Sequence, residues 1–119
     1  MEKTQEELDL FQAALSMEEP WFVSYRELDK KELLLHVGLN FRRGAAFACP
    51  DCGKPCKVFD IVDEDRTWRH LNFWQYQTVL HARLPRVKCL TCRKILTVKV
   101  GWARPHAGLT WLFESFVME

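Results

Sequence analysis

The sequence predicts an α+β fold in which small antiparallel sheets surround a cluster of cysteines, with one helix near each end of the chain. Several segments alternate apolar and polar residues with a period of two, which is typical of strands. Two Cys-x-x-Cys pairs, at residues 49–52 and 89–92, supply the cluster. Apolar residues recur at helical spacing at both ends. A chain of 119 residues has the size of one domain.

The first element expected is a short amphipathic helix over residues 4–15. Thr4 and Glu7 have the spacing of a capping box, in which Thr4 is the N-cap. Apolar residues follow at helical intervals from Leu8 to Leu15. We expect this helix to cover the core.

A β-hairpin is expected next. Residues 21–28 are rich in aromatic and β-branched side chains, and residues 33–42 show the clearest two-residue alternation in the chain. The charged segment 29–32 lies between them and would form the turn. Residues 43–48 are expected to be a linker to the cysteine-bearing part.

The remaining elements are further strands and a closing helix. Strands are expected at residues 57–62, 67–73, 78–84 and 94–102, the middle two as a pair. Residues 110–119 predict a helix with Thr110 as its N-cap. Because this apolar helix reaches the last residue without a cap, we expect it to be the start of a longer helical segment.

Composition restricts the class of protein. The apolar share of 48% and charged share of 28% are those of a globular protein. The sequence shows neither a signal peptide nor an apolar run that could span a membrane, so a cytoplasmic protein of bacterial type is expected. Charge is uneven: residues 1–32 hold 4 basic and 9 acidic side chains, and the remaining residues hold 13 and 7. The basic part is therefore the cysteine-bearing part.

The cysteine pairs predict a structural zinc site, with Cys49, Cys52, Cys89 and Cys92 as the four ligands. Zinc prefers four tetrahedral ligands, and two residues between cysteines let one tight turn aim both sulfurs at one point. Gly53 suits the backbone angle that ends the first turn, whereas Arg93 takes the matching place in the second and predicts strain or a different turn. All four positions would be filled by protein, which leaves none for a catalytic water.

Other interpretations of these residues remain open. A redox role would suit a lone Cys-x-x-Cys pair better than two pairs. Cys56 is left over, either as a competing ligand or as a free thiol. His70 and His81 are weaker ligand candidates, because neither has ligand spacing to another residue. The acidic cluster of residues 60–65 resembles a solvated turn, so no catalytic residue is expected.

The expected organisation is a single zinc-binding domain over residues 1–119. Residues 1–45 would form a helix plus a β-hairpin layer. Residues 46–105 would form a zinc-ribbon-like part, with an insert between the cysteine pairs longer than a short ribbon loop. Residues 106–119 would begin a helical segment.

A set of ordered phrases resembles the N-terminal zinc-finger region of ISL3-family insertion-sequence transposases. The phrases cover nearly the whole chain: Asp9-Leu10-Phe11, Pro20-Trp21, Cys49-Pro50-Asp51-Cys52-Gly53, Arg66-Thr67-Trp68-Arg69-His70-Leu71-Asn72, the run from Ala82 to Cys89, Trp102-Ala103-Arg104-Pro105 and Leu109-Thr110. The four cysteines match the family's zinc positions, and Arg93 departs from the usual glycine. The resemblance implies that a helix-turn-helix and a catalytic domain with a DDE-type acidic triad follow, so that this chain would not itself be an enzyme.

The expected function is recognition of DNA at transposon ends, without cleavage. Six basic residues near the predicted zinc site are candidates for DNA contact, and aromatic residues are interleaved with them. These candidates are Arg66, Arg69, Arg83, Arg86, Lys88 and Arg104. The alternatives are a module that assembles transposase subunits by self-association and an RNA-binding zinc ribbon. No membrane partner and no small-molecule substrate are expected.

Overall fold

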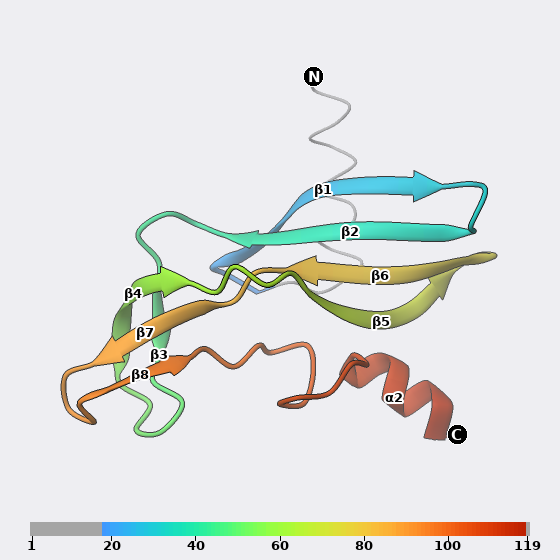
Figure 1. The fold of residues 1–119 in the computed structure, drawn as a ribbon. Helices are drawn as coiled ribbons and strands as arrows, with labels where there is room; N and C mark the ends of the chain where they lie inside the picture. The colour runs from blue at the N-terminus through green and yellow to red at the C-terminus, as the bar shows by residue number, and fades with distance from the viewer. Residues whose placement is uncertain (1–17, 119) are drawn as a thin grey trace.

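The computed structural model describes residues 18–118, and the side chains of residues 18–115 (Figure 1). Eight strands and one helix lie in this range. The helix expected at residues 4–15 lies outside it. Among the described residues no helix has the length and apolar character needed to cross a membrane.

The first sheet combines two hairpins. One hairpin is β1 (Trp21–Asp29) with β2 (Leu34–Phe41), and the other is β5 (Arg66–Phe73) with β6 (Tyr76–Ala82). The strand order is β1-β2-β6-β5, and β2 runs parallel to β6 at the centre. The predicted hairpin of residues 21–42 is confirmed, and so is the pairing of the two later strands.

The second sheet has the order β3-β4-β7-β8 and carries the cysteines at one end. Its strands are β3 (Ala46–Ala48), β4 (Pro55–Ile61), β7 (Pro85–Cys89) and β8 (Lys94–Thr97). Neighbouring strands are antiparallel. The β5–β6 hairpin leaves this sheet after β4 and returns at β7, which explains the long insert between the cysteine pairs (Figure 1).

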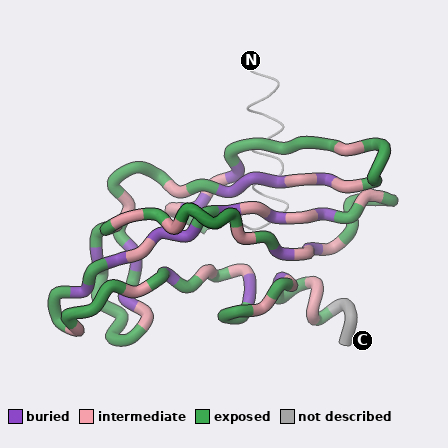
Figure 2. Tube along the Cα trace, viewed as in Figure 1, coloured by how far each residue is buried: buried purple, intermediate pink, exposed green. Residues whose placement is uncertain are grey.

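One hydrophobic core serves both sheets. In the first sheet Val37, Leu80 and Trp68 lie side by side on adjacent strands and are at most 1% exposed. Figure 2 shows these buried positions alternating with more exposed ones along β2 and β6. The alternation places one face of the sheet inside and leaves the other to solvent.

Aromatic rings join the two sheets. The ring of Trp21 in β1 lies 5.0 Å from that of Trp102 and 5.9 Å from that of Phe47 in β3. Trp102 in turn makes an edge-to-face contact with Trp68, at 5.3 Å and 90°. Such contacts bury large apolar areas in a preferred geometry. They tie the cysteine-bearing sheet to the first sheet.

The segment after β8 crosses beneath the first sheet to α2 (Trp111–Met118) (Figure 1). Two isolated bridges hold this segment, Arg69 with Leu109 and Ala103 with Thr110. Thr110 is the N-cap, as predicted: its Oγ1 accepts a hydrogen bond from the N–H of Phe113 at 3.2 Å.

The predicted fold class, α+β with small antiparallel sheets and a helix at each end, is wrong. The described residues are predominantly β. The helix α2 has eight residues, and the strand that it mainly packs against is β5. Residues 46–48, expected to be part of a linker, form β3 by pairing with β4. Residues 85–89, for which no strand was expected, form β7 between β4 and β8. The first sheet is mixed rather than antiparallel. The strand expected at 94–102 ends at Thr97.

Candidate metal centre

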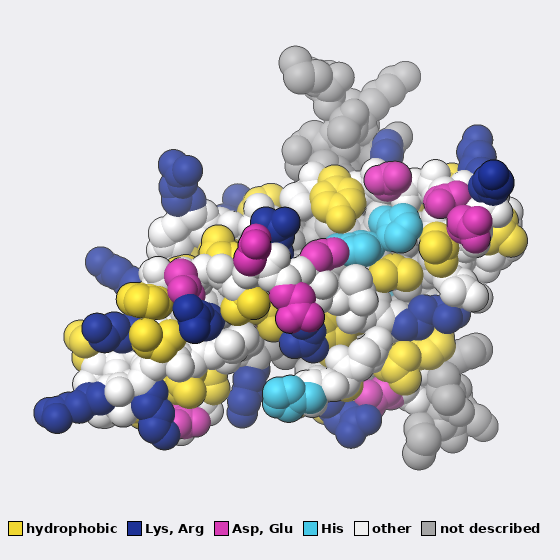
Figure 3. Space-filling view, in the orientation of Figure 1, with side chains coloured by type: hydrophobic (Ala, Val, Ile, Leu, Met, Phe, Trp, Pro, Cys, Tyr) yellow, Lys and Arg dark blue, Asp and Glu magenta, His cyan; other side chains and the backbone are white. Residues whose placement is uncertain are grey.

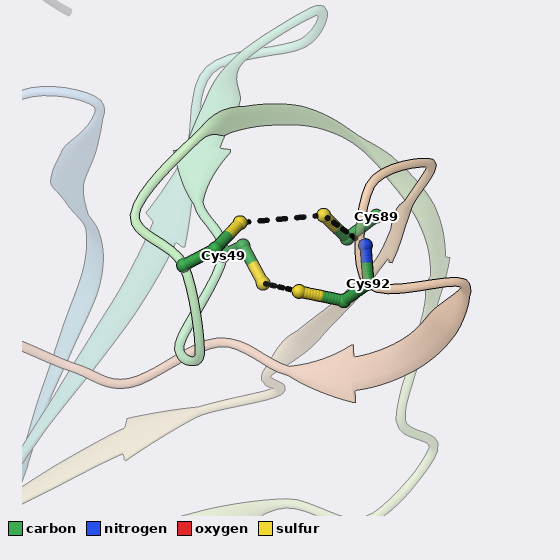
Figure 4. Close-up of side chains that lie close together, drawn as sticks. Cys49, Cys89 and Cys92 are labelled. Atoms are coloured by element: carbon green, nitrogen blue, oxygen red, sulfur yellow. Dashed lines mark hydrogen bonds between the residues drawn. The ribbon is translucent and has the colours of Figure 1, made fainter.

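Two tight turns of the second sheet bring the four cysteines together. The first turn connects β3 to β4 and carries Cys49 and Cys52, and the second connects β7 to β8 and carries Cys89 and Cys92. Because β4 and β7 are paired, both turns lie at the same end of the sheet. Figure 4 shows the thiols of the two turns pointing toward one another.

The two turns have the same backbone geometry. The N–H of Gly53 donates to the carbonyl of Cys49, and the N–H of Arg93 donates to that of Cys89, each at 2.8 Å. Gly53 has φ of 80° and Arg93 has φ of 57°. The second turn therefore keeps the shape of the first, and Arg93 adopts the left-handed conformation that glycine accepts without steric cost.

The thiol spacing fits a tetrahedral zinc ion. All four sulfurs lie within 4.8 Å of one another, and two of the separations are 3.9 Å (Cys49–Cys92) and 3.5 Å (Cys52–Cys89). Zn–S bonds of about 2.3 Å at tetrahedral angles place sulfurs about 3.8 Å apart. Four thiolates are also the donor set of structural zinc, with no open coordination position.

The hydrogen bonds of the turns prepare one thiol for ionisation. The backbone N–H of Cys92 donates to the Sγ of Cys89 at 3.4 Å and lowers the pKa of that thiol to about 6. Contact with the Cys52 thiol, together with burial, raises the pKa of Cys92 to about 12. In the absence of a cation, closely spaced thiols cannot all ionise, so the charge of a metal ion is needed to hold four thiolates.

The remaining ligand candidates lie outside this cluster. Cys56 is buried, its Sγ donates to the carbonyl of Lys54 at 3.4 Å, and burial raises the pKa of its thiol. His70 is hydrogen-bonded to Thr110, and His81 to His36 and Asp65. Among the described residues, the four predicted cysteines are the group of three or more such side chains whose ligand atoms converge.

Most of the six basic residues proposed for DNA contact have partners within the chain. Five of them are engaged with neighbours, by ion pairs, a hydrogen bond or ring contacts: Arg66 with Trp68, Arg69 with Asn72 and Phe113, Arg83 with Asp63, Arg86 with Asp60, and Arg104 with Glu114. Lys88 is exposed and has no ion-pair partner among residues 18–118. Only Arg86 and Lys88 belong to the strand that leads into a cysteine turn.

Further basic side chains near the cysteines escaped the sequence prediction. Lys57 lies on β4 beside Lys88 of β7, which was predicted, because each is next to the paired residues Val58 and Val87 on the side toward the turns. Lys54 and Arg93 belong to the turns themselves, and Lys94 is the first residue of β8. Figure 3 shows lysine and arginine gathered at this end of the molecule. The signal available in the sequence was the density of basic residues within a few positions of each Cys-x-x-Cys pair.

Comparison with known proteins agrees with this centre. Residues 45–92 match a family described as the zinc-finger of transposase IS204/IS1001/IS1096/IS1165. Two similar proteins, from Mycobacterium tuberculosis strains CDC 1551 / Oshkosh and ATCC 25618 / H37Rv, are each named transposase for insertion sequence element IS1557. Each is 38% identical over 69 residues, covering 58% of this chain and 15% of the relative, so the chain spans a small part of their length. No solved structure matches. The zinc-finger match and the four-cysteine cluster together identify structural zinc as the cofactor.

Proposed function

Because residues 45–92 match a zinc-finger family of transposases, we propose that this chain is the part of a transposase that recognises the DNA of transposon ends. The observation that carries the proposal is the basic surface beside the zinc turns. Lys57, Lys88 and Arg93 are without ion-pair partners among the described residues, and Lys57 and Lys88 are exposed. Cations without ion-pair partners, held beside rigid turns, attract phosphate oxygens and position a protein on a duplex.

In this proposal zinc acts through structure. It holds the two turns at a fixed separation and thereby fixes the spacing of the lysines on β4 and β7. The neighbouring ion pairs Lys94–Asp51 (3.3 Å) and Arg86–Asp60 hold other cations of the same sheet in place. DNA contact by Lys88 and the loosely held Arg83 belongs to the same proposal, whereas Arg104 lies beside α2.

A salt titration with a terminal-repeat duplex tests the proposal. The variant Lys57→Ala/Lys88→Ala removes two cations beside the zinc turns. If both contact phosphate, log K against log salt loses about 1.8 of its slope, at about 0.9 per contact. The matched control is Lys30→Ala/Lys31→Ala, which removes the same charge from the β1–β2 turn at the other end of the first sheet.

The two variants separate specific use of this surface from general attraction. Equal losses of affinity in both would show that only net charge matters. Unchanged affinity in Lys57→Ala/Lys88→Ala, or no binding of the wild type at low salt, would contradict DNA recognition by this surface.

We further propose that strand cleavage is not performed by these residues. The acids that cluster at residues 60–65 are committed to bases: Asp60 to Arg86, Asp63 to Arg83 and Asp65 to His81. These acids come from one short segment, whereas a two-metal nuclease holds its metal ions between acids brought together from distant segments. Metal-dependent cleavage of DNA by the purified chain, lost in Asp60→Asn, would contradict this.

Assembly of subunits is the second candidate, and one observation favours it. Trp74 at the tip of the β5–β6 hairpin is 81% exposed and has φ of 58°. A bulky side chain held in solvent by an unfavourable backbone angle suits an interface. If this candidate is right, light scattering shows self-association of the wild type that Trp74→Ala removes. A wild type that is monomeric at all concentrations would contradict assembly and leave DNA recognition as the remaining candidate.

A further inference from the structure

Two histidines and an aspartate form a hydrogen-bonded chain on the solvent-facing side of the first sheet. Nδ1 of His36 in β2 lies 2.7 Å from Nε2 of His81 in β6. Nδ1 of His81 lies 2.8 Å from Oδ2 of Asp65, which precedes β5. The side chain of His81 is 17% exposed. This group is separate from the cysteine centre, which lies in the other sheet.

The contacts determine how protons are shared. Asp65 accepts the proton on Nδ1 of His81, so in the neutral ring Nε2 of His81 carries a lone pair. That lone pair faces Nδ1 of His36, which must then supply the proton between the two rings. Two imidazolium rings could not meet at this distance, because two N–H groups would face each other. The site therefore has room for one cation, a proton or its equivalent, between two nitrogens.

The surroundings favour a positive ion. A cavity of about 660 Å³ opens beside His81, and its lining includes Asp63, Asp65 and Arg83. Arg83 is directed to Asp63, at 3.6 Å. On the same face Glu27 is the cross-strand partner of His36, which adds a carboxylate beside the second ring.

A glycine closes one side of the site. Gly38 is the cross-strand partner of His81 and lies two residues from His36 on the same face. The ring of Tyr25 lies directly over Gly38, in the space that a Cβ would fill. This packing places the ring of Tyr25 next to both histidines and limits the access of water from that side.

We propose that His36 and His81 form a second metal site, for a borderline transition-metal cation such as Co²⁺, Ni²⁺ or a second Zn²⁺. The ion takes the place of the proton between the rings, with Nδ1 of His36 and Nε2 of His81 as ligands, and the proton of His36 moves to its own Nε2. Asp65 holds the His81 ring in the required tautomer, which is the usual arrangement behind a metal-bound histidine.

Little rearrangement is required. Metal–nitrogen bonds of about 2.0–2.1 Å place two tetrahedral ligand nitrogens about 3.3 Å apart, so the two rings separate by about 0.6 Å. Water and the neighbouring carboxylates complete the coordination. Such a site binds an ion exchangeably, in contrast to the closed four-cysteine site.

Titration of the zinc-loaded full chain with Co²⁺ tests the proposal. We expect one equivalent of cobalt to bind while the zinc content stays at one equivalent per chain. The ring signals of His36 and His81 should broaden in the NMR spectrum before those of the exposed His106. Exchange of cobalt into the cysteine site would be visible separately as thiolate absorption bands.

Variants identify the ligands. His81→Asn and His36→Asn should each abolish the second equivalent, Asp65→Asn should weaken it about tenfold as loss of an outer partner does, and the matched control His106→Asn should leave it unchanged. Binding retained in both histidine variants, or no second equivalent in the wild type, would overturn the proposal and leave the pair as a hydrogen bond. If a variant misfolds, the order of broadening in the wild type still decides.

Discussion

Gly53 and Arg93 occupy matching positions in the two cysteine turns, and both have positive φ. A Cβ in the left-handed conformation costs about 1–2 kcal/mol, whereas glycine adopts it freely at an entropic cost of about 0.5–1 kcal/mol in the unfolded chain. The donated N–H bonds of the two turns are equally short, so Arg93 tolerates this strain without changing the turn. The resulting strain should be measurable.

Arg93→Gly should therefore stabilise the chain by about 0.5–1 kcal/mol, since relief of steric strain exceeds the added entropy of the unfolded state. Urea unfolding of the zinc-loaded protein measures the change. The matched variant Gly53→Ala introduces the same strain into the first turn and should destabilise by about as much. An equal effect of the same sign in both variants would contradict the argument.

Single cysteines test the zinc ligands at the same scale. Cys89→Ser should abolish stoichiometric zinc binding, because it removes one of four converging sulfurs and the thiol with the lowered pKa. Cys56→Ser is the matched control, since that thiol is directed to the carbonyl of Lys54 and should leave one zinc per chain. Metal analysis of both purified variants checks this. Full zinc content in Cys89→Ser would refute the ligand assignment.

At the scale of elements, a side-chain hydrogen bond links the N-cap of α2 to the first sheet. Nδ1 of His70 in β5 lies 2.7 Å from Oγ1 of Thr110, and the pair is buried. The same hydroxyl oxygen accepts from the N–H of Phe113. A hydroxyl that accepts from the helix and donates to His70 requires a neutral histidine with a free lone pair on Nδ1. Burial lowers the pKa of His70, which favours this neutral form.

Thr110→Ala should destabilise the chain by about 1 kcal/mol through loss of the N-cap, and more because His70 loses its partner. Thr110→Ser keeps the hydroxyl and is the matched control. Thermal unfolding measures both variants. Equal stability of Thr110→Ala and Thr110→Ser would show that the cap does not hold α2.

The lowered pKa of His70 also predicts a pH dependence. Above pH 6.5, the ordinary value for histidine, folded and unfolded chains are both neutral at this residue and it has no effect. Below that pH the unfolded chain binds the proton more readily, so stability falls as pH decreases toward the folded-state pKa. The free energy of unfolding should therefore fall more between pH 7.5 and pH 5.5, about one unit on either side of 6.5, in the wild type than in His70→Asn. Equal losses of unfolding free energy in the two proteins would contradict the role assigned to His70.

At the scale of the whole molecule, the zinc turns are part of the common core. Cys49 and Cys89 are at most 2% exposed and belong to the same cluster of buried residues as Val37 and Trp68. Loss of the metal leaves four closely spaced sulfurs at the end of this core without a cation to hold them together. The first sheet has its own apolar face, built by β2 and β6, and depends less on the ion.

Chelation of zinc should therefore disorder the second sheet and loosen the first. Binding energy at a structural zinc site is folding energy, because the unfolded chain has no formed site. Amide signals from β3, β4, β7 and β8 should broaden or vanish, while those of the β1–β2 hairpin should be the last to change. An unchanged amide spectrum after proven removal of zinc would contradict this coupling.

Local sequence patterns are sufficient to predict the strands with clear alternation and the cysteine turns. Leu35, Val37 and Leu39 repeat every second residue and lie buried on one face, because the period of a strand is a local property. Two residues between cysteines likewise fix a local turn that brings two sulfurs together. The N-cap at Thr110 follows from its side chain alone.

The pairing of strands and the contacts between distant polar groups depend on how the whole chain packs. The parallel pairing of β2 with β6 joins residues more than 40 positions apart, and no local pattern encodes it. It places His36 beside His81. Other tertiary contacts give Arg83, Arg86 and Arg104 their ion-pair partners, which spacing in the sequence does not reveal. β3 is three residues long and apolar throughout, and it is a strand because β4 supplies its hydrogen bonds. The predicted α+β class is wrong because strands predominate among the described residues.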